Sequence, residues 1–278
     1  MNETRFKAMG TDWWVHADLP GLADAAPAAV EAIEACLSRF RPDSSLSRLN
    51  RERSVTDPLL AEVTRQAIRI AQLTAGAFDP TLGADLVGLG YDRSFDALGG
   101  SVTVVAPPQP RLHLALLGGT VTLDGPGLLD LGGIGKGWAV DHVLQLLLDR
   151  GAAEVLVDGG GDIRGAGRAW PVGVGDDLIA DAGQHAVATS STQRRRWRTI
   201  DGSWQHHILD PKTRRPASAA IDTATVTAPT AALADALATA VLVDPDGLLP
   251  RLAELGATAA VRGLDGQWWT TSDWSTDA

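Results

Sequence analysis

The stretch that decides the fold reads LLDLGGIGKGWAVDHVLQLLLDRG and spans residues 128–151. Apolar residues lead into a run of closely spaced glycines, and after Lys136 apolar residues recur at helical spacing up to Gly151. The pattern predicts a strand end, a glycine turn and a helix that stops at Gly151. Glycines let the backbone approach a ligand, and a helix N-terminus favours anions, so Lys136 marks a candidate phosphate site. The alternative is a tight strand-to-helix turn with a solvated lysine.

This turn does not match the common nucleotide-binding signatures. A P-loop needs GxxxxGK followed by Ser or Thr, but Asp130 stands at the first glycine and Gly137 follows Lys136. No GxGxxG follows a predicted strand, which excludes a Rossmann fingerprint. The fold class therefore has to come from the rest of the chain.

On both sides of this stretch, helices and strands mix without strict βαβ regularity. Further helices are predicted at 28–39, 59–75, 231–243 and 247–255, and strands at 6–19, 154–158, 187–191, 197–200, 223–229 and 258–263, with several short strands within 101–124. No fixed-period repeat, low-complexity run or clear linker interrupts them. We expect a single α+β domain over residues 1–278.

Composition narrows the function classes. The chain has 278 residues, 45% hydrophobic and 21% charged, with a net charge of -10, which argues against general nucleic-acid binding. Its one cysteine, Cys36, has helical spacing with Ile33 and Leu37 and is read as a core residue. The N-terminus lacks a signal-peptide pattern, and no apolar run reaches the ~20 residues of a membrane span. We therefore expect a cytoplasmic protein without an integral membrane segment.

A carboxylate and a hydroxyl share one face of the helix predicted at 231–243. Asp235 and Thr239 are one turn apart in an otherwise apolar sequence, where a carboxylate is expensive to bury unless it is paired or coordinated. These hard oxygen atoms suit Mg²⁺. The alternative is an Asp235 that faces solvent.

Other polar residues in turns allow two readings each. Four aspartates lie in or beside glycine or proline turns, and many turn aspartates only cap the backbone; they are Asp79, Asp130, Asp158 and Asp162. His206 and His207 precede ILDP, where a histidine often bonds the backbone. A basic cluster is either a solvated strand face or a contact for ligand phosphates or an acidic partner; it comprises Arg194, Arg195, Arg196, Arg198, Lys212, Arg214 and Arg215.

Taken together, these motifs resemble the FAD:protein FMN transferase family, also called the ApbE family. Eight stretches match in order along nearly the whole chain: MGT (9–11), FRPDSSLSRLN (40–50), GAFDPTLG (76–83), DLGGIGKGWAVD (130–141), VDGGGDIR (157–164), VATSS (187–191), HHILDP (206–211) and VTAPTAALADALATAVLV (226–243). Eight stretches in register make a chance resemblance very improbable.

The resemblance implies an ApbE-like (T-fold-related) α+β domain with Mg²⁺-dependent activity. Such an enzyme cleaves FAD, attaches FMN through a phosphoester bond to Thr or Ser of an acceptor flavoprotein with a DxxxGA(S/T)-like motif, and releases AMP. The residues it implies for contact with FAD are Met9, Phe40, Ala77, Phe78, Asp79, Asp130 and Lys136, with His207 and Ile208 lining the reaction centre. For Mg²⁺ it implies the carbonyl of Gly133 together with Asp235 and Thr239.

The catalytic roles stay open at this point. His207 is the candidate base for the acceptor hydroxyl, Asp162 is the alternative, and Lys136 would add positive potential. The same site could use water as acceptor and act as an Mg²⁺-dependent FAD pyrophosphatase. A non-catalytic flavin-binding protein is a third reading, but storage alone does not need the Asp235/Thr239 pair.

Several positions depart from the family pattern. Phe40 stands where the family usually has tyrosine, Asp158 begins DGGGD where NAGGD is usual, and Ser191 and Arg214 stand where the family often has glycine. These loops lie near the expected substrate, so the departures bear on acceptor preference more than on flavin binding.

Overall fold

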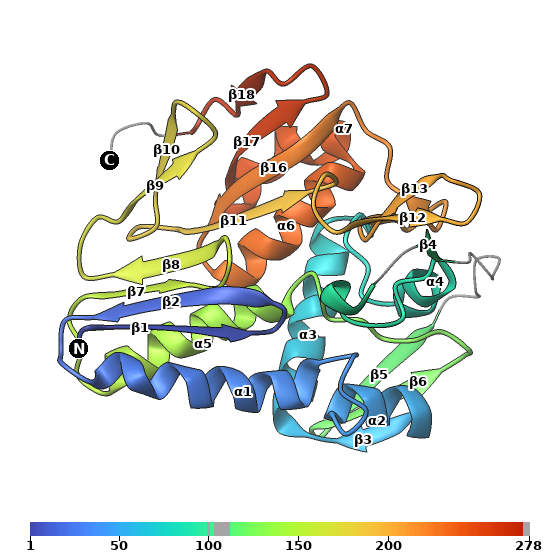
Figure 1. Cartoon of the computed structure of the whole chain (residues 1–278), viewed down its shortest axis with the longest axis horizontal. Helices are drawn as coiled ribbons and strands as arrows, with labels where there is room; N and C mark the ends of the chain where they lie inside the picture. The colour runs from blue at the N-terminus through green and yellow to red at the C-terminus, as the bar shows by residue number, and fades with distance from the viewer. Residues whose placement is uncertain (99–100, 103–111, 275–278) are drawn as a thin grey trace. The chain divides into compact units, whose positions relative to one another are not determined.

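The computed structural model describes residues 1–98, 101–102 and 112–274 (Figure 1). The chain divides into two compact units, each built from separate stretches. Unit 1 comprises Met1–Ala32, Ile134–Ser191 and Ala219–Ala278, and unit 2 comprises Ile33–Gly133 and Thr192–Ser218. Helices and mixed sheets occur in both, so the expected α+β class is confirmed. That residues 1–278 act as one domain stays a prediction.

Unit 1 is built on an eight-stranded antiparallel sheet. Its strands, in spatial order, are β1 (Glu3–Ala8), β2 (Thr11–Ala17), β7 (Val155–Asp158), β8 (Asp162–Ala166), β11 (Ala186–Ser191), β16 (Ile221–Ala228), β17 (Thr258–Gly263) and β18 (Trp268–Thr270). The single strand predicted at 6–19 is wrong, because a turn splits it into β1 and β2. Met9 and Gly10 form this turn with φ of 52° and 69°.

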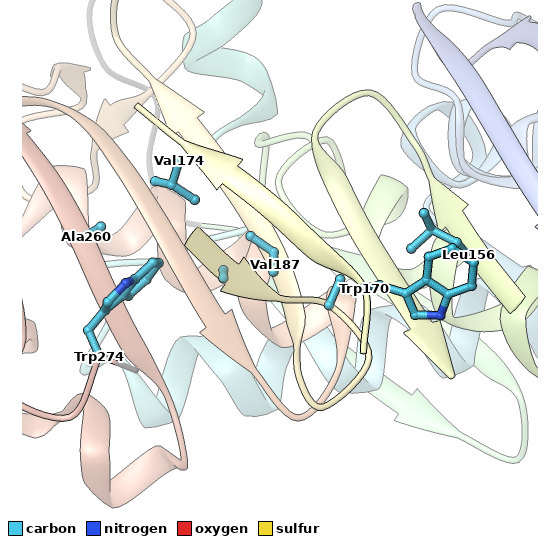
Figure 2. Close-up of a cluster of buried hydrophobic side chains, with 8 residues drawn as sticks. Leu156, Trp170, Val174, Val187, Ala260 and Trp274 are labelled. Carbon is cyan, nitrogen blue, oxygen red and sulfur yellow. The ribbon is translucent and has the colours of Figure 1, made fainter. Parts of the chain in front are cut away.

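Both faces of this sheet are covered. Helices α5 (Gly135–Asp149) and α6 (Ala231–Val243) pack on one face (Figure 1). The hairpin of β9 (Pro171–Val174) and β10 (Leu178–Asp181) supplies a core on the other, where Trp170 packs beside Leu156 and Trp274 beside Ala260 (Figure 2). Burial on both faces explains why β16 reads as a nearly continuous buried strand.

Helix α6 has the bounds predicted from its apolar sequence, and its start is capped twice. Thr230 Oγ1 accepts a hydrogen bond from Leu233 N at 3.2 Å. The carboxylate of Asp141, from α5, accepts from Ala231 N and Ala232 N at 2.9 Å each. The two helices are therefore fixed to each other at the N-terminus of α6. The remaining helical segments of unit 1 are Leu22–Ala25, α7 (Pro245–Leu248) and Leu249–Leu255, and α1 (Ala26–Leu37) continues into unit 2.

Unit 2 combines short helices with small sheets. Its helices are α2 (Ser45–Glu52), α3 (Pro58–Leu73), α4 (Gly83–Gly88) and the 3-10 turn Phe95–Ala97. One sheet has the strand order β3 (Ser54–Thr56), β6 (Thr120–Asp124) and β5 (His113–Leu117). A second sheet has the order β13 (Trp204–His206), β12 (Arg196–Thr199) and β4 (Ser101–Val102). The remaining two strands, β14 (Leu209–Asp210) and β15 (Arg215–Pro216), form a hairpin. A buried core joins α4 to β12 and β14 through Leu82, Leu86, Leu89, Tyr91, Trp197 and Leu209.

The other predicted helices and strands are confirmed in part, with local corrections. The helices predicted at 28–39 and 59–75 are confirmed as α1 and α3, whereas 247–255 forms the end of α7 and a 3-10 helix rather than one α-helix. Of the strands expected within 101–124, residues 103–111 lie outside the described residues. Cys36 is buried, and burial raises the pKa of its thiol to about 12, which fits a core residue. Over the described ranges, no helix combines the length and apolarity required to cross a bilayer.

Candidate active site

The start of α5 is pressed against the start of α6. A Cβ atom at Gly137 would lie 2.2 Å from the carbonyl oxygen of Ala231, so a side chain there would force the helices apart. The close approach brings Gly137 N to 3.3 Å from Oδ2 of Asp235. This packing explains why Gly137 stands where a P-loop would carry Ser or Thr, and it turns the first residues of α5 toward a carboxylate of α6.

Lys136 joins two buried carboxylates in unit 1. Its Nζ donates to Oδ2 of Asp162, at the start of β8, and lies 3.3 Å from Oδ2 of Asp235. Asp162 is 2% exposed and Asp235 3%, while the Lys136 side chain is 17% exposed. One ammonium thus faces two carboxylates in a region with little water.

This imbalance perturbs the protonation of Asp162. Burial disfavours its charged form, the neighbouring charge of Asp235 acts in the same direction, and Lys136 opposes both. Their net effect is to raise the pKa of Asp162 from 3.8 to about 7. A carboxyl group with such a pKa can accept or release a proton near neutral pH, which an ordinary aspartate cannot.

Hydroxyl oxygens lie beside this charge cluster. Thr239 follows Asp235 by one turn of α6, and its Oγ1 is 3.1 Å from Oγ of Ser190 on β11. In the part of the chain that the structure describes, no group of three or more His, Cys, Asp or Glu side chains could hold a metal. A cation here would therefore need oxygens from hydroxyls, the backbone or a ligand besides Asp235, which is typical of Mg²⁺. The third predicted ligand, Gly133, belongs to unit 2.

Unit 2 gathers aromatic rings around a guanidinium group. Arg39 donates from Nε to Oδ2 of Asp130 at 2.5 Å and from Nη1 to the carbonyl oxygen of Tyr91 at 2.7 Å. The guanidinium lies over the Phe40 ring at 4.3 Å and over the Tyr91 ring at 5.1 Å. Tyr91 in turn stacks on Trp197 with 5.3 Å between centroids. We call Arg39, Phe40, Tyr91, Asp130 and Trp197 the aromatic cluster.

The aromatic cluster contains two predicted residues, Phe40 and Asp130, and three that sequence reasoning missed. Arg39 directly precedes the FRPDSS stretch, yet nothing local pairs it with Asp130, 91 positions away. Trp197 sits within the run of arginines, where it reads as part of a surface strand. The strict alternation of Arg196, Trp197 and Arg198 was the signal for one buried face.

The remaining predicted residues are more dispersed. Ala77, Phe78 and Ile208 are 8%, 4% and 2% exposed, so their side chains pack inside unit 2. Asp79 caps its own turn by accepting from Thr81 N at 2.8 Å and from Thr81 Oγ1 at 2.6 Å.

The last two predicted residues lie on turns or next to them. Met9 forms the β1–β2 turn of unit 1. His207 is half-buried directly after β13, and its neighbour His206 bonds the carbonyl oxygen of Ala217 at 3.1 Å. Burial lowers the pKa of His206, which keeps that ring neutral and fits a structural histidine.

With this geometry described, the class of protein follows from comparison with known families. The family model described as ApbE family matches residues 9–261, so the chain belongs to the ApbE family. Two curated relatives carry the name FAD:protein FMN transferase. The one from Treponema pallidum is 35% identical over 245 residues, covering 76% of this chain and 67% of the relative. The one from Vibrio cholerae is 32% identical over 273 residues, covering 84% and 79%. The chain is accordingly a transferase.

Solved structures agree with this assignment. The ApbE protein of Thermotoga maritima is similar with a TM-score of 0.84 and 27% identity, covering 97% of this chain and 96% of that one. The flavin transferase ApbE from Vibrio cholerae is similar with a TM-score of 0.76 and 27% identity, covering 98% and 97%. The likeness therefore extends over both units and is not confined to one.

Proposed function

We propose that this chain is an Mg²⁺-dependent FAD:protein FMN transferase. It cleaves FAD and attaches FMN through a phosphoester bond to Thr or Ser of an acceptor flavoprotein that carries a DxxxGA(S/T)-like motif, and it releases AMP. The names of its relatives support the flavin and the acceptor protein. The observation that carries the proposal is the pair of buried carboxylates, Asp162 and Asp235, held against Lys136 at the start of α5.

The donor set fits a divalent cation. Two carboxylates against one ammonium leave an excess of negative charge, and Thr239 and Ser190 add hydroxyl oxygens beside it. Asp235 and Thr239 would hold Mg²⁺, as their spacing on α6 predicts. Bound there, Mg²⁺ would neutralise the charge of the pyrophosphate and of the departing AMP.

The reaction moves one phosphoryl centre between two oxygens. The acceptor hydroxyl oxygen bonds to the FMN phosphorus, the bond from that phosphorus to the bridging oxygen breaks, and AMP leaves with the electron pair. Lys136 supplies positive charge beside the reacting phosphate. The hydroxyl proton must go to a base.

Asp162 is the base that the electrostatics favour. In the metal-free protein, burial and the charge of Asp235 raise its pKa to about 7, so its carboxylate is a proton acceptor near neutral pH. General-base catalysis of this kind contributes about 10²–10⁴-fold in rate. His207 is the alternative. If Asp162 is the base, D162N should lose the acidic limb of the pH–rate profile while H207Q retains it, and the reverse pattern would assign the role to His207.

The test mixes the protein with FAD, Mg²⁺ and an acceptor domain carrying the motif. Flavin fluorescence on the denatured acceptor band, abolished by EDTA, is the expected result. AMP release without a fluorescent band would replace the proposal with an FAD pyrophosphatase that uses water as acceptor. Neither band nor AMP would leave a flavin-binding protein without turnover.

A further inference from the structure

A basic hairpin in unit 2 has one buried face and one face in solvent. Strands β12 and β13 pair Arg196 with His206 and Arg198 with Trp204. Trp197, between the two arginines, is 4% exposed, and its Nε1 donates to the carbonyl oxygen of Leu89 at 2.8 Å. Because side chains alternate along a strand, the two arginines lie on the opposite face, together with Trp204, which is 52% exposed.

The arginines of this outer face are organised but not neutralised. The guanidinium groups of Arg196 and Arg198 lie over the Trp204 ring at 4.8 and 5.2 Å, within cation–π range. Arg196 also donates from Nη1 to Oε1 of Gln193 at 2.6 Å. Among residues 1–98, 101–102 and 112–274, neither Arg196 nor Arg198 forms an ion pair with a carboxylate. We call Arg196, Arg198 and Trp204 the arginine hairpin face.

The charge of this region contrasts with that of the chain. The segment Thr192–Ser218 carries seven Lys and Arg against two Asp, a net charge of +5, whereas the whole chain has a net charge of -10. Asp201, the nearest acid in sequence, accepts from Thr199 and Ser203 within the hairpin turn. The guanidinium groups are therefore available to carboxylates from another molecule.

We propose that the arginine hairpin face docks an acidic segment of the protein acceptor. The proposal rests on the function proposed above, which requires a protein partner. Guanidinium groups bind carboxylates in a planar, two-bond geometry, and exposed Trp and Arg are enriched where protein interfaces gain most of their binding energy. A protein segment is favoured over DNA or an anionic membrane, because the strong negative charge of the whole chain repels a large polyanion.

Binding is tested with two labelled peptides on the intact protein. Both carry the DxxxGAT motif; one is flanked by a run of glutamates and the other by the same number of glutamines. By fluorescence anisotropy, we expect the glutamate peptide to bind at least about tenfold more tightly, with a difference that shrinks as salt is added. R196E/R198E should abolish the difference.

The matched control is R48E/R69E, which makes the same change of charge at two exposed arginines elsewhere in unit 2. It should preserve the preference for the glutamate peptide. Equal binding of the two peptides by the unmodified protein, or equal loss in both double variants, would overturn the proposal. So would tighter binding of a DNA oligonucleotide or of phosphatidylserine vesicles that depends on Arg196 and Arg198.

Kinetic measurements of flavinylation separate the docking proposal from the proposed function. If the acceptor motif is flavinylated, R196E/R198E should raise the KM for the glutamate peptide about tenfold and leave the KM for the glutamine peptide and the kcat unchanged. If neither peptide is flavinylated but the anisotropy preference holds, the docking face stands and the transfer activity fails. If both peptides are flavinylated without a preference for glutamate, the transfer activity stands and the docking face fails.

Discussion

One cluster of buried charge in unit 1 differs from the other buried ion pairs of both units. In unit 2, the half-buried carboxylate of Asp130 pairs with Arg39 and the buried carboxylate of Asp85 with Arg214. In unit 1, the buried carboxylate of Asp222 pairs with Arg262 in the same way. In the cluster, by contrast, Lys136 alone faces both Asp162 and Asp235. A balanced pair fits a role in holding a fold together, whereas an unbalanced cluster destabilises the protein that contains it.

The imbalance is therefore best explained by a ligand. Perturbed carboxylates with a specific charge partner concentrate at functional sites. Within the aromatic cluster the Tyr91 and Trp197 rings are buried, whereas the Phe40 ring is 38% exposed and suits the recognition of a flat ligand by stacking. The comparison assigns the stabilisation of charge to unit 1 and the recognition of rings to unit 2. Substitutions in each unit test that assignment.

The largest effect is expected from Asp235→Asn, which keeps the shape of the side chain and removes its charge. Loss of a metal-holding carboxylate should lower the kcat for AMP release from FAD by at least about 10³-fold, since charge stabilisation by the metal is worth several kcal/mol. FAD affinity, followed by flavin fluorescence, should survive in part. The measurement is AMP release across a titration of Mg²⁺.

Its matched control is Asp149→Asn, which removes an exposed carboxylate from the end of α5. That variant should keep full activity and the same dependence on Mg²⁺. Undiminished Mg²⁺-dependent turnover in D235N would remove Asp235 from the metal site and would leave the charge imbalance of unit 1 without its proposed role.

The second test uses the pH dependence of stability in the presence of EDTA. The folded protein raises the pKa of Asp162 to about 7, while the unfolded chain keeps it near 3.8. Between these values the folded state binds more protons than the unfolded state, so this group makes the free energy of unfolding fall as pH rises from about 4 to 7. Urea unfolding of the protein and of D162N, compared at several pH values, isolates this contribution.

In D162N that part of the slope should disappear, because an amide does not titrate. A slope that is the same in both proteins would mean that Asp162 titrates normally and that Lys136 already balances the cluster. The cluster would then resemble the other buried ion pairs, and the contrast with them would be lost.

Whether a feature of the structure could be predicted from the sequence depends on how far apart along the chain the interacting residues lie. The bounds of α6 followed from its own apolar run, which is a local feature. The Asp235/Thr239 spacing was equally local. The contacts of Lys136 with Asp162 and Asp235 join residues 26 and 99 positions apart, and no periodic pattern encodes such a meeting.

The turns that were missed have a similar cause. The single strand expected at 6–19 required Met9 to be extended, but Met9 has a positive φ, which propensity disfavours for any residue except glycine. The neighbouring Gly10 was the available signal. Arg214 is a comparable case, because no local pattern predicts its positive φ or its ion pair with the distant Asp85. That its departure from the family's glycine affects acceptor preference stays a prediction.

The third test addresses that ion pair in unit 2. Arg214 has a φ of 59°, a region that favours glycine, and its Nη2 lies 3.3 Å from Oδ2 of Asp85, whose side chain is 1% exposed. Arg214→Gly should relieve backbone strain of about 1 kcal/mol but remove the guanidinium from a buried carboxylate, a loss of about 3–5 kcal/mol. We expect a net destabilisation of about 2–4 kcal/mol by urea unfolding.

The double variant D85N/R214G should recover most of this stability, because it removes both charges. Arg215→Ala, at the neighbouring exposed arginine, should change stability by much less. A more stable R214G would show that strain outweighs the ion pair, and balanced charge would then be no general feature of unit 2.

The smallest effect is expected from Phe40→Ala. The Phe40 ring is 38% exposed and lies 5.4 Å from the Tyr91 ring, so its loss should change stability little. If the aromatic cluster stacks on a ring of FAD, losing one stacking surface should raise the Kd for FAD about tenfold, at about 1–3 kcal/mol per stacked base. The kcat at saturating FAD should stay within about twofold. Flavin fluorescence titration and AMP release together separate the two effects.

Phe40→Tyr is the control, because it keeps the ring and adds the hydroxyl that the family usually has. Its Kd should match that of the unmodified protein. A fall in kcat for F40A without a change in Kd would place the ring at the reacting phosphate and not at a flavin or adenine ring. D235N and F40A would then affect the same step, and the assignment of chemistry to one unit and recognition to the other would have to be abandoned.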